Sequence, residues 1–206
     1  MKASSGNASE VEAYGEAGPR QPQRARGKIR VAALMAAAAA LFVEKGYEAT
    51  TMTQIASRAG AAIGTLYLFF PTKPALAKVM LIELAELLSL RLDALQVRTR
   101  GWRAAAIADA LFDELSLFLA AHPAYAALID LPTDGAWKPS VRARRRVQIA
   151  TLFAQAEPPL PHDQPERLAV IVPHLIRIAI LLGTEPAELR APVQSELRAM
   201  LHHHLA

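Results

Sequence analysis

The segment spanning residues 51–73 constrains the fold most strongly, because its pattern indicates two short helices joined by a tight corner. Thr53 is the candidate N-cap of the first helix, and Gly60 supplies the backbone freedom that ends it. A second helix is expected over residues 62–69, and Pro71 stops it. This pattern predicts a helix-turn-helix, in which the second helix enters the DNA major groove while the first crosses the backbone.

Small and apolar residues in this segment are placed to hold the two helices at a fixed angle. Ala56 allows a close approach, and Gly60 makes the corner. Ile55, Leu66 and Phe70 provide an apolar wedge between the helices.

The order of residues around this corner resembles the N-terminal domain of the TetR family of transcriptional regulators. The resemblance covers about residues 24–80, and the remainder is similar to the family only in being helical and of suitable length. The matching residues are Phe42, Gly46, Tyr47, Thr51, Thr53, Ile55, Ala56, Ala59, Gly60, Gly64, Thr65, Leu66, Tyr67, Phe70, Lys73 and Leu76.

The resemblance implies a set of DNA contacts. It places the start of the recognition helix nearest the base edges, where Thr65 can donate a hydrogen bond or meet a thymine methyl group. Thr53, Tyr67 and Lys73 match positions that commonly hold phosphates, although Tyr67 can also be read as a core aromatic. Arg24 and Arg26 belong to a basic arm that adds backbone or minor-groove contacts. The expected base-proximal residues are Ala62, Ile63, Gly64 and Thr65.

Three residues depart from the family pattern and alter the expected readout. Ala62 stands where a Ser or Thr cap is common, Ile63 where a polar or basic residue is usual, and Phe69 where His or Tyr is frequent. With few hydrogen-bonding side chains, this helix is expected to rely on apolar contacts, backbone N–H groups and DNA shape.

Charge converges on the same segment. The net charge of the chain is +4, and residues 20–73 contain eight basic and two acidic residues, whereas residues 74–206 contain fourteen of each. A basic segment suits displacement of counterions from a phosphate backbone, although basic residues can also form only a solvated face. The arginines at 142 and 144–146 are read as such a face rather than as a second nucleic-acid site.

Helical spacing of apolar residues continues along the chain. A helix over about 28–45 precedes the corner, and a long helix over 74–100 links the two domains. Ser140 is a candidate cap, and Pro192 predicts a kink or a late start in the last helix. The other expected helices span 102–121, 123–129, 140 onward, 165–182 and 186–205.

The last two predicted helices carry apolar residues around most of their circumference and are expected to form a homodimer through about residues 165–205. A two-fold DNA site calls for a two-fold protein, whereas the alternative is that these helices complete the core of a monomer. The adjacent histidines at 202–204 point in different directions on a helix, so no metal site is predicted there.

The family's C-terminal domain usually encloses a small-molecule pocket, so the resemblance also implies an effector, which it does not identify. Each candidate lining residue has an alternative place in the core, a loop or an interface. The candidates are Trp102, Phe112, Phe118, His122, Tyr125, Trp137, His174 and Arg177.

Composition excludes several other classes. Apolar residues make up 52% and the chain has no cysteine, so a disordered chain, a disulfide framework and a thiolate site are excluded. The basic and apolar run at 24–43 has the look of a secretory signal, but it starts late and is too short for a membrane span. The expected location is cytoplasmic. No catalytic residue, cofactor or metal motif is found, which leaves a helical scaffold or nucleoid-type protein as the alternative function.

The sequence therefore predicts an all-α protein with three parts. Residues 1–23 form a disordered tail, 24–73 a three-helix DNA-binding domain, and 74–206 a larger helical domain for effector binding and dimerisation. The expected function is a ligand-responsive regulator, most simply a repressor, that binds a roughly palindromic operator.

Overall fold

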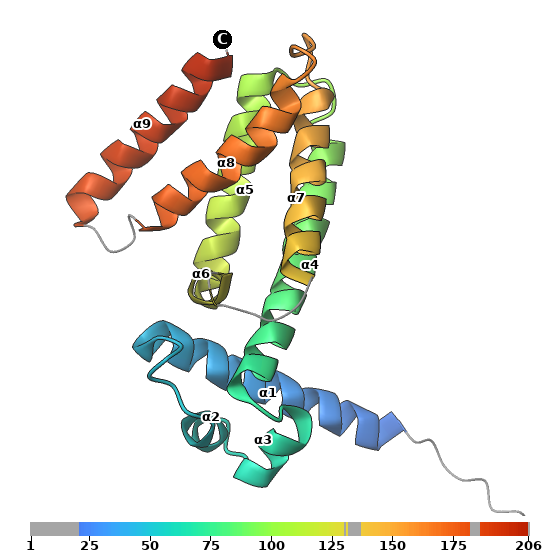
Figure 1. The fold of residues 1–206 in the computed structure, drawn as a ribbon, viewed down its shortest axis with the longest axis vertical. Coiled ribbons are helices and arrows are strands. Elements are labelled where there is room, and N and C mark those ends of the chain that lie inside the picture. Colours follow the sequence, from blue (N-terminus) through green and yellow to red (C-terminus); the bar gives the residue numbers. More distant parts are fainter. Residues whose placement is uncertain (1–20, 130, 132–136, 182–185, 206) are drawn as a thin grey trace, which may run out of the picture.

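The computed structural model describes residues 21–129, 131, 137–181 and 186–205, and these residues form nine helices without a strand (Figure 1). This confirms the predicted all-α class. Most of the predicted tail lies outside the described residues. Within the described ranges, no helix is long and apolar enough to span a membrane.

Three helices form the N-terminal domain at one end of the molecule: α1 (Gln21–Lys45), α2 (Met52–Arg58) and α3 (Ile63–Phe69). Gly46 and Gly60 end α1 and α2 with φ angles of 81° and 62°, a region that glycine enters without steric cost. Side chains of these three helices meet in one core together with Leu76 of the following helix, and the central members of this core are fully buried. These are Leu34, Phe42, Ile55, Leu66 and Leu76.

Two sequence predictions for this domain are wrong in detail. The cap of α2 is Thr51 and not Thr53: its hydroxyl accepts a hydrogen bond from the Gln54 amide at 3.2 Å, and the Gln54 side chain accepts one from the Thr51 amide at 3.1 Å. This reciprocal capping box fixes the start of the helix. In addition, α1 begins at Gln21, so Arg24 and Arg26 lie on a helix rather than on an extended arm.

The linking helix α4 (Lys73–Arg98) runs from the DNA-binding domain through the length of the C-terminal domain (Figure 1). Thr72 caps it by accepting a hydrogen bond from the Ala75 amide at 3.1 Å, and Pro74 occupies the first turn. The remaining helices are α5 (Ala104–Ala121), α6 (Pro123–Ile129), α7 (Trp137–Ala154), α8 (Gln164–Leu181) and α9 (Ala187–Leu205).

The helix α7 begins at Trp137, so Ser140 lies inside the helix and is not its cap, which corrects the sequence prediction. Gln148 ties α7 to α4 by donating to the Ser89 carbonyl at 3.1 Å and to Asp93 at 2.6 Å. Pro192 lies inside α9, and the helix continues through it. The core of the C-terminal domain therefore consists mainly of α4, α5, α7 and α8.

Candidate DNA-binding surface and domain junction

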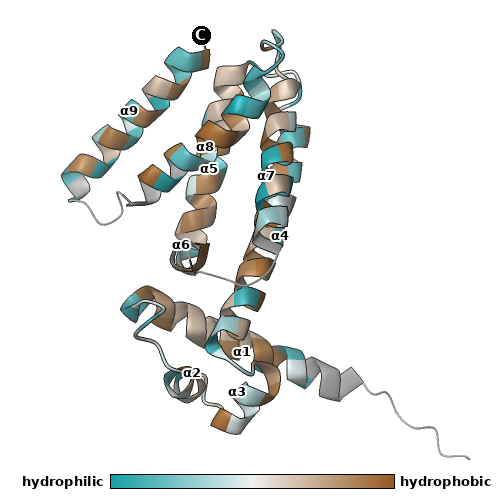
Figure 2. Cartoon of the chain, viewed as in Figure 1, coloured by the Kyte–Doolittle hydropathy of each residue, from teal (hydrophilic) through white to brown (hydrophobic). Residues whose placement is uncertain are grey.

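The face of α3 that points away from the core carries large apolar side chains. Leu66 is fully buried, and residues two positions away on a helix point to the opposite side. Leu68 is accordingly 78% exposed and Tyr67 50% exposed. Figure 2 shows hydrophobic colour at this outer end of α3. The alternative interpretation of Tyr67 as a core aromatic does not fit its exposure.

Leu68 was missed by the sequence-based site prediction. The available signal was its spacing, because it lies four residues after Gly64 and therefore on the same helical face. Without a side chain at Gly64, Leu68 dominates this outward line. An isolated exposed leucine needs no explanation, but this one lies on the outward face of the second helix of the helix-turn-helix and is therefore added to the candidate contact residues.

The start of α3 adjoins a basic hollow of about 420 Å³ between α1 and the corner of the helix-turn-helix. Arg26 and Arg30 line it from α1, while Ala62 and Thr65 line it from the recognition helix. The structure thus brings Arg26 and Thr65, two of the predicted DNA-binding residues, to one hollow and places Arg30 beside them. Ala62 provides no side-chain cap, and Ile63 is 40% exposed. The side chain of Arg24 lies outside the described residues.

Lys73 has a role that the sequence did not reveal. Its ammonium donates hydrogen bonds to three backbone carbonyls of the turn between α1 and α2, those of Tyr47 at 2.8 Å, Glu48 at 3.2 Å and Thr50 at 2.9 Å. It also lies 4.3 Å from the centre of the Tyr47 ring. An ammonium has three donors, so these carbonyls use its full capacity. Lys73 therefore fastens the first turn of α4 to the α1–α2 turn, and its contact with a phosphate stays a prediction.

The turn that Lys73 grips is itself held by buried polar and aromatic groups. Thr50 is 1% exposed and donates its hydroxyl to the Gly46 carbonyl at 2.8 Å. The Tyr47 ring packs 5.2 Å from that of Phe42, and burial raises the pKa of its hydroxyl. These contacts order the carbonyls that Lys73 binds.

A second polar tie joins α1 to α2. Arg58 donates to both carboxylate oxygens of Glu44, one of them at 2.6 Å. The Arg58 hydrogen bond lowers the pKa of Glu44, and Glu44 in turn raises the pKa of Arg58. Thr53, which the sequence placed near a phosphate, is exposed on α2 and leaves the capping to Thr51.

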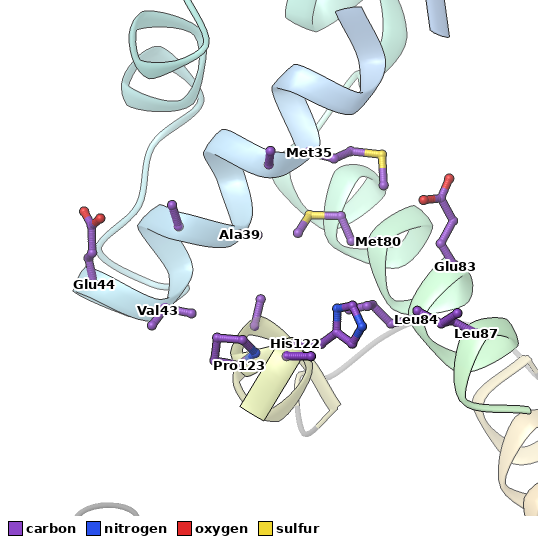
Figure 3. A pocket seen from close by; sticks show the side chains of 14 residues that line it. Met35, Ala39, Val43, Glu44, Met80, Glu83, Leu84, Leu87, His122 and Pro123 are labelled. Carbon is purple, nitrogen blue, oxygen red and sulfur yellow. The ribbon is translucent and has the colours of Figure 1, made fainter. Parts of the chain in front are cut away.

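A cavity of about 510 Å³ lies at the junction of the N-terminal helices and the C-terminal domain, beside the contact between α1 and α6. It is bounded by α1, α4 and the segment that leads into α6, as Figure 3 shows. Met35 and Met80 lie on one side, with His122 and Pro123 on the other. We call this space the junction cavity.

Among the predicted effector-binding residues, His122 lines the junction cavity, whereas three aromatic residues are buried in the core: Phe112, Phe118 and Tyr125. The Phe118 ring lies 4.8 Å from the His122 ring and 5.3 Å from that of Tyr125. Burial raises the pKa of Tyr125, whose hydroxyl accepts a hydrogen bond from Arg145.

The other predicted effector-binding residues do not join this cluster. Trp102 is 40% exposed between α4 and α5. His174 and Arg177 lie exposed on α8, with His174 Nδ1 2.6 Å from the Val170 carbonyl oxygen. The side chain of Trp137 lies outside the described residues.

The N-terminal helices match a known family. The sequence model for bacterial regulatory proteins of the tetR family matches residues 34–80, which include α2, α3 and the Lys73 clamp. Over these residues, the chain matches the TetR family. The matched residues include the exposed helix α3 and part of the lining of the adjacent basic hollow.

Solved structures extend the TetR-like fold over nearly the whole chain. A TetR-family transcriptional regulator from Streptomyces coelicolor superimposes with a TM-score of 0.60 and 19% identity, covering 86% of this chain and 99% of that one. A gamma-butyrolactone receptor, described as ArpA-like, gives 0.57 and 23%, covering 87% and 99%. FadR from Bacillus subtilis, solved with stearoyl-CoA, gives 0.61 and 16%, covering 81% and 95%. No sequence among the curated proteins matches this one.

Proposed function

We propose that this chain is a transcriptional repressor that binds a roughly palindromic operator as a homodimer and leaves it when a small molecule binds. The observation that carries the proposal is the outward face of α3 beside the basic hollow. Thr65, Tyr67 and Leu68 lie on the recognition helix, and Arg26 and Arg30 supply positive charge next to it.

The two groups of residues divide the work of DNA recognition. Arginines near the start of α3 contact phosphates and set affinity, since phosphate contacts position a protein without reading sequence. Thr65 and Leu68 contact base edges in the major groove. Thr53 at the start of α2 and Tyr67 on α3 add backbone contacts. A protein that acts on chromosomal operators works in the cytoplasm.

Exposed apolar residues on the last two helices support the homodimer. On α8, Val170, Ile171 and Ile178 are 40%, 37% and 46% exposed. On α9, Leu189 is 53% exposed and Met200 63% exposed. Covering such a face with its symmetry copy buries apolar surface and places two recognition helices on two half-sites.

Effector control is supported by two proteins of the same fold that are described together with a small molecule. One is a gamma-butyrolactone receptor, and the other was solved with stearoyl-CoA. Both share the fold of this chain at identities too low to carry over a ligand. We therefore propose a small-molecule effector for this chain without taking its identity from either protein.

The proposal is tested by selecting DNA from a random duplex library with the full chain, then footprinting the selected sequence. The expected result is protection of one discrete, roughly palindromic site by a species of twice the chain mass. Uniform coating of DNA without a preferred sequence contradicts the proposal and favours the helical scaffold.

Truncating Leu68 tests the recognition face directly. Leu68→Ala is expected to weaken binding to the selected site roughly tenfold, by removing an apolar contact with a base. Because the side chain is 78% exposed, the substitution should leave the thermal unfolding midpoint unchanged. Leu117→Ala is the matched control, since Leu117 is 64% exposed on α5, a helix of the C-terminal domain. Equal affinities of both variants and the parent protein would remove Leu68 from the interface.

A further inference from the structure

Half of the α1 residues that line the junction cavity are alanines, and the others are Met35, Val43 and Glu44. Ala36, Ala39 and Ala40 follow at helical spacing and all line the cavity. The opposite face of α1 carries the large core residues Leu34 and Phe42. The helix α1 therefore presents large side chains to the core, whereas its cavity side combines small alanines with Met35 and Val43.

The walls of the cavity come from both domains. Besides α1, the linking helix contributes Met80, Leu84 and Leu87, and the segment at α6 contributes Pro123 and Ala124. The volume of about 510 Å³ lies in the usual range for small-molecule sites, about 300 to 1,000 Å³. Two methionines of the lining, Met35 and Met80, add flexible side chains that can adapt to the shape of a guest.

The formal charges on this lining are two carboxylates, Glu44 and Glu83. Figure 3 shows both at the rim of the apolar space. The negative charge of Glu44 is compensated by Arg58, which donates two hydrogen bonds to the carboxylate. Glu83 has no ion-pair or hydrogen-bond partner among the residues that the structure describes. The rim therefore carries one uncompensated negative charge beside an apolar interior.

We infer that the junction cavity binds a small apolar cation, with its hydrocarbon part against the alanines of α1 and its positive charge near Glu83. The apolar walls favour burial of a hydrocarbon chain, and an unpaired carboxylate attracts a cation and repels an anion. The mouth at Glu83 is solvent-accessible, so the charged head keeps part of its hydration while the tail is buried.

A guest in this cavity touches the DNA-binding domain through α1 and the C-terminal domain through α6. It therefore favours whichever relative placement of the two domains gives the better fit. The regulatory step rests on the proposed repressor function: binding of a cation at this site would change operator affinity. Binding itself does not depend on that function.

The chemical class is tested with three probes that share one hydrocarbon tail: decyltrimethylammonium, decanol and decanoate. Isothermal titration of the full chain, below micelle-forming concentrations, is expected to give about tenfold tighter binding for the cation than for the anion. Decanol should fall between them. Tighter binding of decanoate, or equal binding of all three, overturns the assignment.

Paired variants locate the site. Glu83→Gln is expected to weaken decyltrimethylammonium binding by about threefold and to leave decanol unchanged. Glu86→Gln is its control, because Glu86 lies on the same helix outside the lining and pairs with Arg144.

Ala36→Leu should abolish binding of all three probes by filling the cavity. Ala32→Leu, one turn earlier on α1 and outside the lining, should not.

The two proposals fail in different ways. If the cation binds wild-type protein but not Ala36→Leu, while the chain coats DNA without preference, the site stands and the repressor function falls. If a palindromic site is protected but Ala36→Leu binds the cation as well as wild type, the junction site falls and the repressor stands. When both hold, the cation should change operator affinity in wild type and not in Ala36→Leu.

Discussion

The helix α4 meets the DNA-binding domain in two contrasting ways. In its first turn, Lys73 donates to three carbonyls of the α1–α2 turn within 3.2 Å. Farther along, Met80, Leu84 and Leu87 face α1 across the junction cavity. One contact is polar, directional and close, whereas the other is apolar and leaves a void.

This difference divides α4 into a fixed end and an adaptable end. Hydrogen bonds from an ammonium to ordered carbonyls allow little displacement, while apolar surfaces separated by a cavity can slide or close at small cost. The Lys73 clamp is therefore the expected pivot if α1 and α4 change their separation when the cavity is filled. A ligand in the cavity acts at the adaptable end, where the resistance is least.

The largest expected effect comes from breaking the pivot. Lys73→Met removes three charge-assisted hydrogen bonds and a cation–π contact but keeps most of the side-chain volume. The expected loss is about 2–3 kcal/mol of unfolding free energy, which lowers the thermal midpoint by roughly 5–10 °C in a chain of this size. Thermal unfolding followed by circular dichroism measures it.

Lys78→Met is the control for this prediction, because Lys78 is exposed on α4 and should change the midpoint little. A salt titration of DNA binding separates the clamp from a phosphate contact. An unchanged midpoint in Lys73→Met, together with a salt slope reduced by about one ion, would contradict the clamp and support the family-based assignment.

A smaller effect is expected from filling the void. Ala36→Leu adds hydrocarbon to the junction cavity and should raise the unfolding free energy by about 1 kcal/mol, because apolar surface on both domains leaves water. Ala32→Leu changes α1 in the same chemical way outside the cavity and should be neutral. A stability loss in Ala36→Leu alone would mean that the space is too narrow for a guest.

The fold was largely predictable because its signals are local. Glycine stops, apolar spacing and the Ile55–Leu66–Phe70 wedge each depend on residues close in sequence, and all three wedge residues are buried. The capping box was readable too: Thr51 and Gln54 have the required spacing, and choosing Thr53 overlooked the reciprocal partner.

The two features that distinguish α4 could not be predicted in the same way. The partners of Lys73 are backbone carbonyls more than twenty residues away, and backbone groups leave no mark in a sequence. The cavity arises from alanines that read simply as good helix formers. Its existence depends on how far α6 and α4 stand from α1, which is a tertiary property. Among the effector residues inferred by resemblance, Phe112, Phe118 and Tyr125 lie in the core, which is likewise a matter of tertiary packing.

The smallest effect should come from the Glu44–Arg58 tie, which holds α1 to α2 at the edge of the cavity. The pKa of Glu44 is lowered from its ordinary value of 4.5 by the Arg58 hydrogen bond, so the folded state favours the ionised form. The stabilisation is therefore fully present above pH 4.5 and is lost as the pH falls through the lowered pKa. Glu44→Gln should lower the thermal midpoint slightly at neutral pH, less than the other substitutions change it, and the difference from wild type should vanish in acid.

Glu48→Gln, in the exposed turn without a charged partner among the described residues, should show no such convergence. A Glu44→Gln deficit that persists undiminished in acid would show that the side chain stabilises α1 by packing, and the Lys73 clamp would then be the stronger candidate for the polar tie that orients the DNA-binding domain.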